Sequence, residues 1–295
     1  MSQRGINITI IGVGLIGGSL ALDLRYKYPV NKIYGADKNP DHLIRAKQLG
    51  LIDEALSLKK AIELSDLLIL AVPVNVSIKL LPDILDSIDK QVVMDVGSTK
   101  ANLIKSIKNH PNKGRFVATH PMAGTEFSGP EAAIVNLYKN KNVIFCDIEN
   151  SDDDAHKLVK DIYESIGMKL LYMESNAHDI HAAYVSHISH ISSFALSLTV
   201  LDKEKDQKKI LNMASGGFES TVRLAKSAAS MWTPIFMLNQ ENVLDVMDNY
   251  IEKLKEFREA ISTGNEQKIV SLIEESNKIR KVLDKKDEPE LINLD

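Results

Sequence analysis

Short apolar runs alternate with helix-like stretches along residues 1–150 of the chain. The runs are rich in Val, Ile and Leu, as fully buried parallel strands are. They predict strands at Ile6–Ile11, Lys32–Gly35, Leu67–Val72, Val92–Val96 and Phe116–Thr119. Apolar residues at helical spacing predict helices at Leu15–Tyr26, Pro40–Leu49, Asn75–Asp86 and Lys100–Asn109. This alternation indicates an α/β fold that begins with a parallel, doubly wound sheet of the Rossmann type.

The pattern changes after Glu174. The segment Ser151–Tyr172 still predicts one helix and one strand, but strand signals almost vanish between Glu174 and Lys286. Long stretches such as Ala177–Val200 and Gln240–Ser262 carry apolar residues at helical spacing. We therefore predict an α/β domain over residues 1–173 and an all-α domain over residues 174–295.

The predicted helix Ala177–Val200 is apolar over much of its circumference. Such a helix is buried, either inside its own domain or against another subunit. Because the all-α domain is too apolar to stand alone, we expect a homodimer with a two-fold interface built from the helices after residue 177.

The charge balance gives no reason to expect a nucleic-acid partner. The 295 residues include 36 Lys and Arg against 40 Asp and Glu, a net charge of −4 with no basic run. We therefore expect no nucleic-acid partner. No apolar stretch reaches the roughly 20 residues that cross a bilayer, so we expect no membrane partner, and the first residues do not resemble a signal peptide.

The single cysteine, Cys146, ends the apolar run Val143–Cys146. One cysteine cannot form an internal disulfide, and strand-like apolar surroundings predict a buried packing residue. This fits the reducing environment of the cytoplasm, where we expect the protein to reside.

A glycine motif follows the first predicted strand and opens the first predicted helix. Its pattern is G-x-G-x-x-G, typical of turns that bind the pyrophosphate of a dinucleotide at a helix N-terminus. The cofactor-binding residues expected here are Gly12, Gly14, Leu15, Ile16 and Gly17. A tight strand-to-helix turn without a ligand is the alternative interpretation.

Asp37 ends the second predicted strand, 20 residues after Gly17. A carboxylate at this place binds the ribose hydroxyls of NAD and repels the 2′-phosphate of NADP. We therefore predict NAD as the cofactor, although Lys38 leaves room for some NADP binding. Val72, Pro73 and Ser98 follow later strands, and we expect them to border the nicotinamide half of the cofactor at the same edge of the sheet.

His120 comes directly after the predicted strand Phe116–Thr119. This places it at the carboxyl edge of the sheet, where an imidazole can take a proton from a substrate hydroxyl while hydride leaves the same carbon. The alternative is a histidine that only satisfies the loop backbone.

Four further histidines and one arginine stand in the helical half. His178, His181, His187 and His190 form a cluster on one predicted helix, but with no cysteine in it and no need for a metal in hydride transfer we expect no metal site. Buried histidines beside the cleft, some of them contacting substrate, are the better interpretation. Arg223 lies among small and apolar residues, where its guanidinium either binds a substrate carboxylate or forms an internal salt bridge.

Together these motifs resemble those of the prephenate dehydrogenases, a family that includes arogenate dehydrogenases. The resemblance runs from Ile8 to about Leu244. Its landmarks are Gly12–Ser19, Asp95–Ser98, His120–Glu126, His178-Asp179, Ser186–His190, Gly217-Phe218 through Arg223, and Met231-Trp232. The string His120-Pro121-Met122-Ala123-Gly124-Thr125-Glu126 is far more specific than the glycine motif.

The resemblance implies an NAD-dependent oxidative decarboxylation of prephenate to 4-hydroxyphenylpyruvate, a step of tyrosine biosynthesis. It implies that His120 draws the proton from the ring hydroxyl and that Ser98 contacts both His120 and the cofactor. It also implies that Arg223 binds a substrate carboxylate. The other residues expected at the substrate are His190, His187, Gly124 and Thr125.

The sequence departs from the family at three places near the expected pocket. Ser220 stands where an acidic residue is frequent, Ala228-Ala229-Ser230 replaces an Asp-Pro before Met-Trp, and Ile188-Ser189 replaces Leu-Pro between two histidines. These changes bear on the choice between prephenate and arogenate, and the retained His190 favours prephenate.

Two more distant alternatives remain. One is a β-hydroxyacid dehydrogenase, which typically uses a lysine of the helical domain that has no counterpart motif here. The other is a non-catalytic NAD sensor.

Overall fold

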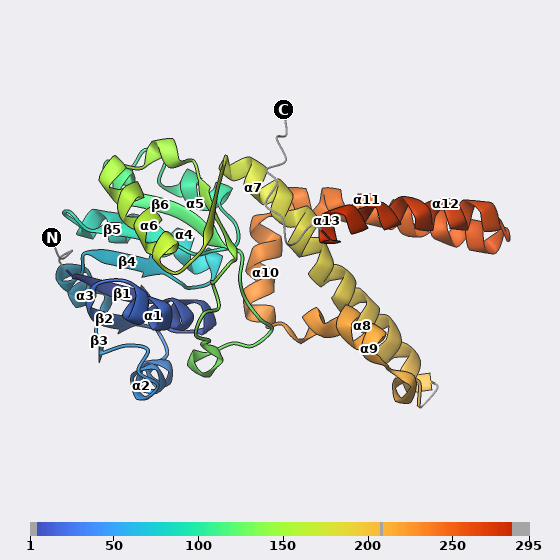
Figure 1. Cartoon of the computed structure of the whole chain (residues 1–295), viewed down its shortest axis with the longest axis horizontal. Helices are drawn as coiled ribbons and strands as arrows, with labels where there is room; N and C mark the ends of the chain where they lie inside the picture. The colour runs from blue at the N-terminus through green and yellow to red at the C-terminus, as the bar shows by residue number, and fades with distance from the viewer. Residues whose placement is uncertain (1–4, 207–208, 285–295) are drawn as a thin grey trace. The chain divides into compact units, whose positions relative to one another are not determined.

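The computed structural model describes residues 5–206 and 209–284. They form two compact units, one ending at Val243 and the other starting at Leu244. The first unit contains an eight-stranded sheet with the order β3-β2-β1-β4-β5-β6-β7-β8 (Figure 1). The strands are β1 (Ile6–Ile11), β2 (Val30–Ala36), β3 (Glu54–Ala55), β4 (Leu67–Leu70), β5 (Val92–Asp95), β6 (Phe116–Pro121), β7 (Asn142–Cys146) and β8 (Lys169–Met173).

Helices cover both faces of the sheet, as expected for a doubly wound fold. They are α1 (Leu15–Lys27), α2 (Pro40–Gln48), α3 (Leu58–Leu64), α4 (Val74–Ser87), α5 (Ala101–Ser106) and α6 (Asp153–Ser165). Successive residues of a strand point to opposite faces, so Ile69 packs in the core with α1 and α6 while Leu68 packs in the core with α3, α4 and α5.

The strands β1, β2 and β3 follow one another toward one edge of the sheet, and β4, β5 and β6 follow one another toward the other. The change of direction falls between β1 and β4, which are parallel neighbours. Loops on the two sides of this point diverge at the carboxyl ends of the strands and leave a crevice there, where dinucleotides bind in such folds. The glycine motif follows β1, and the turn before α4 follows β4.

The five strands predicted from the sequence, β1, β2, β4, β5 and β6, are parallel to one another, but the whole sheet is not. β7 runs antiparallel to β6, with His120 opposite Ile144. Residues 122–141 form a long connection that contains only the single 3-10 turn Pro130–Ala132, not the crossover helix that joins parallel neighbours. Cys146 is buried at the end of β7, as predicted, and burial raises the pKa of its thiol to about 12.

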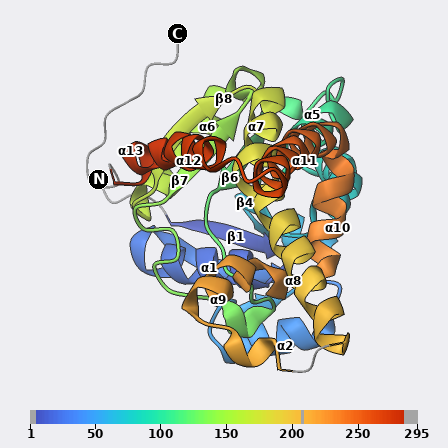
Figure 2. The same ribbon diagram turned by 90° about the vertical axis from the view of Figure 1, so that its right-hand side faces the viewer.

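The chain after β8 is helical, as predicted. The first unit continues with α7 (Ser175–Ala182), a π-helical turn (Ala183–His187), α8 (Ile188–Asp206), α9 (Gly216–Val222) and α10 (Ala229–Leu238). The division between the units falls within α11 (Gln240–Ser262), and α12 (Glu266–Ser276) and α13 (Arg280–Leu283) follow (Figure 2). None of the described helices is long and apolar enough to cross a membrane.

Candidate active site

The glycine turn between β1 and α1 has the backbone that its sequence predicts. Gly12 has φ +96°, and a Cβ there would collide with the main-chain oxygen of Ala71. A Cβ at Gly17 would collide with the main-chain oxygen of Gly12, so this glycine allows the helix to pack on the strand. At Gly14, the N-cap of α1, a Cβ would meet no atom nearer than the nitrogen of Gly129 at 4.0 Å. The turn is therefore tight at its ends and open in the middle, as a pyrophosphate requires.

Asp37 lies directly over this turn. Its Oδ2 accepts a hydrogen bond from the backbone N–H of Val13 at 3.1 Å, and its Oδ1 accepts one from Asn39 at 2.9 Å. These two bonds fix the carboxylate beside the glycine motif, where the adenosine ribose of a dinucleotide lies.

The connection between β6 and β7 is tied to α1 at three points. Ile134 N donates to Ser19 Oγ at 2.9 Å, Asn136 N donates to Asp23 Oδ1 at 2.7 Å, and Tyr138 Oη donates to the main-chain oxygen of Ile16 at 2.7 Å. The loop that follows His120 is thereby anchored to the helix of the glycine motif.

A buried ion pair connects the carboxyl end of β5 to β6. Lys100 and Asp95 are both fully buried and form a short hydrogen-bonded pair. Lys100 Nζ also donates to the main-chain oxygen of Thr119 at 2.7 Å, while Asp95 accepts from the N–H of Gly97 and of Thr119. The two charges are paired with each other and make further hydrogen bonds, which is the condition for burying them. The pair fixes the residue before His120.

His120 lies within β6 rather than after it, since the strand continues to Pro121. Its Nδ1 is 2.8 Å from Nε2 of His178, and Nδ1 of His178 is 2.7 Å from Oδ1 of Asp179. Burial lowers the pKa of His120 well below its ordinary value of 6.5, and neighbouring cationic groups, including Lys100, lower it further. His120 is therefore a neutral imidazole near pH 7, able to accept a proton.

His190 stacks on Trp232, with ring centroids 3.5 Å apart and planes inclined by 26°. Trp232 packs in a small core with Val74 at the start of α4 and Ile235 of α10. The stacked pair is thereby fastened to the turn that contains Val72 and Pro73. The helical part of the unit thus packs against the start of α4 through Trp232 and Ile235.

Arg223 forms a salt bridge with Glu126, with Nη1 and Oε2 3.0 Å apart. Arg223 is half exposed, and its charge also contributes to lowering the pKa of His190, after the larger effect of burial. The salt bridge therefore links the loop that follows His120 to the helical part of the unit.

Two family models match the chain. The nucleotide-binding domain of prephenate dehydrogenase matches residues 20–172, and the dimerization domain of prephenate dehydrogenase matches residues 174–275. The chain belongs to the prephenate dehydrogenase family.

Individual members of the family resemble the chain over most of its length. It is 32% identical to a prephenate dehydrogenase of Lactococcus lactis, covering 94% of this chain and 77% of the relative. It is 30% identical to a cyclohexadienyl dehydrogenase of Zymomonas mobilis, covering 94% and 96%. The crystal structure of A. aeolicus prephenate dehydrogenase in complex with hydroxyphenyl propionate and NAD⁺ superimposes with a TM-score of 0.86 at 33% identity, covering 96% and 100% of the two chains.

Several residues predicted for this family's site lie together at the carboxyl edge of the sheet. Val72 lies against Gly12, and a Cβ at Gly124 would lie 3.9 Å from Cδ1 of Ile16. Ser98 follows β5 in the loop fixed by Asp95, but among the described residues its side chain makes no hydrogen bond to His120. Thr125 accepts from the N–H of Phe127 at 3.3 Å.

His187 differs from the other predicted substrate residues because it is buried. Its exposed fraction is 1%, and its Nδ1 lies 3.2 Å from Nδ2 of Asn239, which also donates to the main-chain oxygen of Asp179. Burial lowers the pKa of His187 to about 4. These surroundings are those of a residue that supports Trp232 and Asp179. Contact of His187 with substrate stays a prediction.

Sequence reasoning placed His178 among the buried histidines beside the cleft, but it linked neither His178 nor Asp179 or Lys100 to His120. The pair His178-Asp179 was visible as a family landmark, but its link to His120 spans 58 positions and depends on how α7 packs against β6. The spacing of Asp95 and Lys100 was also visible, but it does not indicate that both side chains turn inward.

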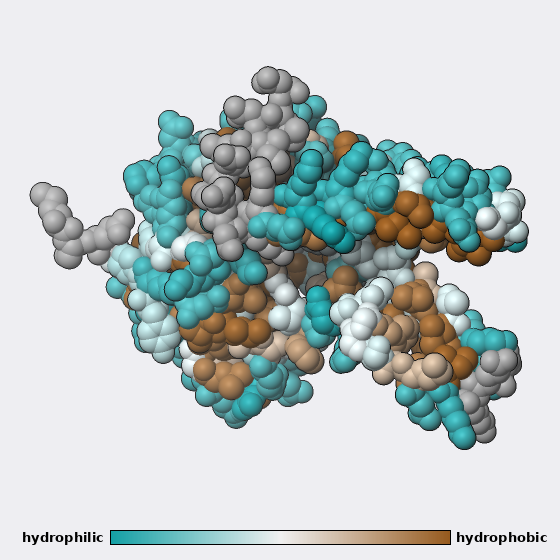
Figure 3. All heavy atoms as spheres, turned by 45° about the vertical axis from the view of Figure 1, so that its right-hand side comes forward, coloured by the Kyte–Doolittle hydropathy of each residue, from teal (hydrophilic) through white to brown (hydrophobic). Residues whose placement is uncertain are grey.

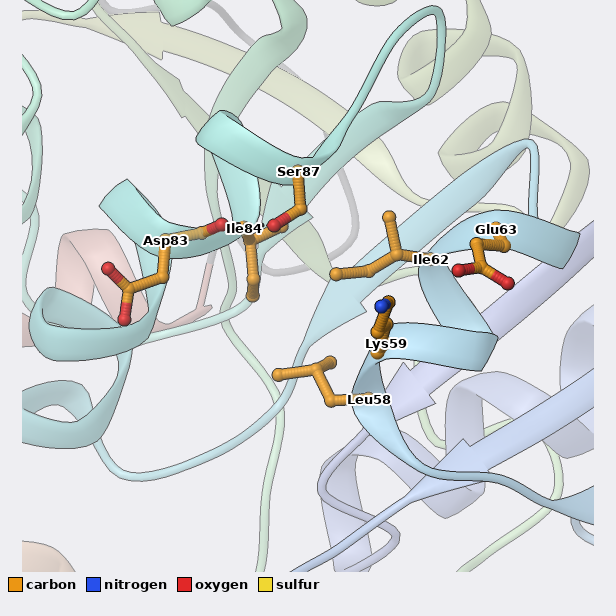
Figure 4. Close-up of a pocket in the computed structure, with 7 residues that line it drawn as sticks. All are labelled: Leu58, Lys59, Ile62, Glu63, Asp83, Ile84 and Ser87. Carbon is orange, nitrogen blue, oxygen red and sulfur yellow. Dashed lines mark hydrogen bonds between the residues drawn. The ribbon is translucent and has the colours of Figure 1, made fainter.

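Two hollows elsewhere in the first unit contain none of the predicted site residues. One, of about 450 Å³, lies between α3 and α4, where Leu58, Ile62 and Ile84 point inward and Glu63 and Asp83 lie at its edges (Figure 4). The other, of about 870 Å³, is lined by α5, the start of α7 and the junction of α10 and α11.

Proposed function

We propose that this protein is a prephenate dehydrogenase in which His120 acts as the general base. The observation that carries the proposal is the position of His120 at the carboxyl end of β6, with Nδ1 bonded to His178 and Nε2 without a partner among the described residues. Family membership excludes the β-hydroxyacid dehydrogenase alternative and the non-catalytic sensor. Arogenate is not favoured, because the relatives named above include two prephenate dehydrogenases at 32% and 33% identity.

The residues present fit NAD as the cofactor. The open backbone at Gly14 and the N-terminus of α1 would hold the pyrophosphate, and Asp37 would bind the adenosine ribose. Val72, Pro73 and Ser98 would border the nicotinamide. When bound, NAD⁺ supplies the acceptor for the hydride that leaves the ring carbon bearing the hydroxyl.

His120 governs the proton of the ring hydroxyl. Its Nε2 accepts this proton as the carbon–hydrogen bond breaks, so that the oxygen can form a carbonyl. The bond to the ring carboxylate then breaks, its electron pair enters the ring, and CO₂ leaves. The ring becomes aromatic, and His120 returns the proton to the phenol oxygen of 4-hydroxyphenylpyruvate. Aromatisation drives the reaction, so the protein mainly orients the groups and stabilises charge.

Arg223 is the group proposed to bind a substrate carboxylate. Its guanidinium already holds a carboxylate, that of Glu126, so its geometry suits one. Gly124 and Thr125 precede Glu126 in the same loop, and we propose that they lie beside the substrate with His190. His190, stacked on Trp232, offers an aromatic wall for the six-membered ring.

The protein is proposed to function as a homodimer. The second matching family model describes a dimerization domain. Exposed apolar side chains occur on α8 (Leu198 and Leu201) and, separately, on α11 and α12 (Leu254, Ile261 and Val270), and Figure 3 shows apolar surface on these helices. The domain limits proposed are residues 1–173 for cofactor binding and 174–295 for substrate binding and dimerisation. The lone buried cysteine supports a cytoplasmic location.

The test is turnover of the purified protein with NAD⁺ and either prephenate or arogenate, followed as NADH at 340 nm. The proposal predicts NADH, CO₂ and 4-hydroxyphenylpyruvate in equal amounts from prephenate. Turnover of arogenate alone would change the substrate, and turnover of neither by a protein that binds NAD would refute the proposal.

A further inference from the structure

A chain of hydrogen bonds runs from the backbone of α5 to the imidazole of His120. Asp179 Oδ1 accepts from the N–H of Lys100 at 2.8 Å, and Oδ2 accepts from the N–H of Ala101 at 2.9 Å. Oδ1 also meets Nδ1 of His178 at 2.7 Å. Nε2 of His178 then meets Nδ1 of His120 at 2.8 Å. His178 and Asp179 are 1% and 2% exposed, so this chain is shielded from solvent.

The backbone donors fix the direction of every later bond. An amide N–H can only donate, so both oxygens of Asp179 act as acceptors. His178 therefore donates from Nδ1 to Asp179, and its neutral ring has a lone pair on Nε2. That lone pair accepts from Nδ1–H of His120. The neutral ring of His120 then keeps its own lone pair on Nε2.

We propose that His178 and Asp179 are positioning residues for catalysis, which hold His120 in the tautomer whose Nε2 accepts the substrate proton. This rests on the proposed role of His120 as general base. Without an acceptor at Nδ1, a neutral imidazole distributes its proton over both nitrogens, and the tautomer with a proton on Nε2 cannot accept another. In serine proteases a carboxylate orients the catalytic imidazole directly, whereas here His178 lies between the carboxylate and the imidazole.

The same chain stabilises the imidazolium that forms during the reaction. When His120 takes the proton, its Nδ1–H becomes a stronger donor to His178, whose own Nδ1–H faces the carboxylate of Asp179. The negative charge of Asp179 thus stabilises a positive charge on His120 through the ring of His178. A positive charge on His178 would oppose that on His120, as the charges of Lys100 and His187 do, so the stabilising chain requires the neutral ring of His178. The chain through His178 is the one contact of His120 among the described residues that links it to an anion.

The direct test is ¹⁵N NMR of the resting protein labelled at histidine, at pH 7.5. The His120 signals are assigned from the spectrum of His120→Asn. The proposal predicts a protonated Nδ1 and an unprotonated Nε2 on both His120 and His178. A proton on Nε2 of His120 in the wild-type protein would overturn it. This readout needs no substrate, so it stands apart from the test of the proposed function.

The second test compares His178→Leu, which removes the acceptor, with His181→Leu, the same substitution at an exposed histidine three residues along α7. His178→Leu should lower kcat for prephenate by roughly 100-fold, with little change in KM or in the Kd for NAD⁺. It should also leave His120 as a mixture of tautomers. His181→Leu should match the wild type.

A merely structural role for His178 would give a different result. The midpoint of thermal unfolding and the Kd for NAD⁺ would change, while the tautomer of His120 and kcat would not. That outcome would refute the proposal. If His178→Leu does not fold, the spectrum of the wild-type protein still decides the question.

Discussion

Arg223 donates a hydrogen bond to Glu126 at 3.0 Å, although 97 positions separate the two residues. The arginine proposed for the substrate therefore already has a carboxylate partner, which would compete with an incoming carboxylate. Glu126→Gln keeps the shape of the side chain but removes its charge. We predict that KM for prephenate falls several-fold while kcat stays within about two-fold, since only ground-state competition is removed.

The matched control for this prediction is Glu131→Gln. Glu131 belongs to the same connection between β6 and β7, but its partner is Arg45 at 2.9 Å. Initial rates at varied prephenate should be unchanged in this variant. A rise of KM in Glu126→Gln would mean that Glu126 orients Arg223 for the substrate instead of competing with it.

Asp37 should decide between NAD and NADP. Asp37→Asn keeps a side-chain oxygen for the N–H of Val13 or Asn39 and removes the charge that repels a 2′-phosphate. We predict that the ratio of kcat/KM for NAD⁺ to that for NADP⁺ falls by at least about 10-fold, with Asp41→Asn on the exposed start of α2 as the control. An unchanged ratio would place the adenosine ribose elsewhere.

The histidines should make the folded state sensitive to mild acid. Burial lowers the pKa of His187 to about 4 from 6.5, so between these values the unfolded chain binds a proton that the folded chain does not. The stabilising contribution is present above pH 6.5 and is lost as the pH falls toward 4. His187 alone should lower the free energy of unfolding by about 2 kcal/mol between pH 7.5 and pH 5.

Urea unfolding at a fixed protein concentration measures this dependence. His187→Gln should unfold with a shallower pH dependence than the wild type, whereas His181→Gln, at an exposed position, should keep the wild-type slope. Equal slopes in all three proteins would show that His187 does not titrate as its burial implies.

Leu198 tests the dimer. Its side chain is 61% exposed in the single chain, and a two-fold interface on α8 would bury one copy of it from each subunit. Each buried leucine contributes roughly 2 kcal/mol, so Leu198→Asp should raise the dimer dissociation constant by at least about 100-fold. Light scattering should then give a mass near the 32.8 kDa of one chain.

Ile44 provides the control because it is 58% exposed on α2, which lies outside the proposed dimerisation domain of residues 174–295. Ile44→Asp should leave the mass at twice that of one chain. A wild-type protein that scatters as a monomer at micromolar concentration would contradict the dimer itself.

The sequence predicted those parts of the fold that local patterns determine. Apolar runs gave β1 to its exact ends and the other predicted strands to within two residues, and Gly12 and Gly17 indicated the cofactor turn because only glycine fits there. The short α3 and the two-residue β3 were missed, since seven and two residues carry too little periodicity. The antiparallel direction of β7 depends on the path of a connection, which local patterns do not encode.

The candidate site was predictable residue by residue but not as a network. His120, Arg223 and His190 were chosen for their chemistry and for the strand or helix that carries them. The bonds from Arg223 to Glu126 and from His120 to His178 join segments far apart in the chain. The orientation of side chains across such contacts is set by tertiary packing, so the partners of these residues required the structure.

The central claim is that His120 is the base of a prephenate dehydrogenase, and His120→Asn tests it most directly. The measurement is NADH formation at 340 nm from prephenate and NAD⁺ by the variant and the wild type, with the Kd for NAD⁺ confirming that the variant is folded. The account predicts wild-type turnover and a loss of kcat by a factor on the order of 10³ in the variant, with NAD⁺ binding unchanged. A variant that retains wild-type kcat would contradict it.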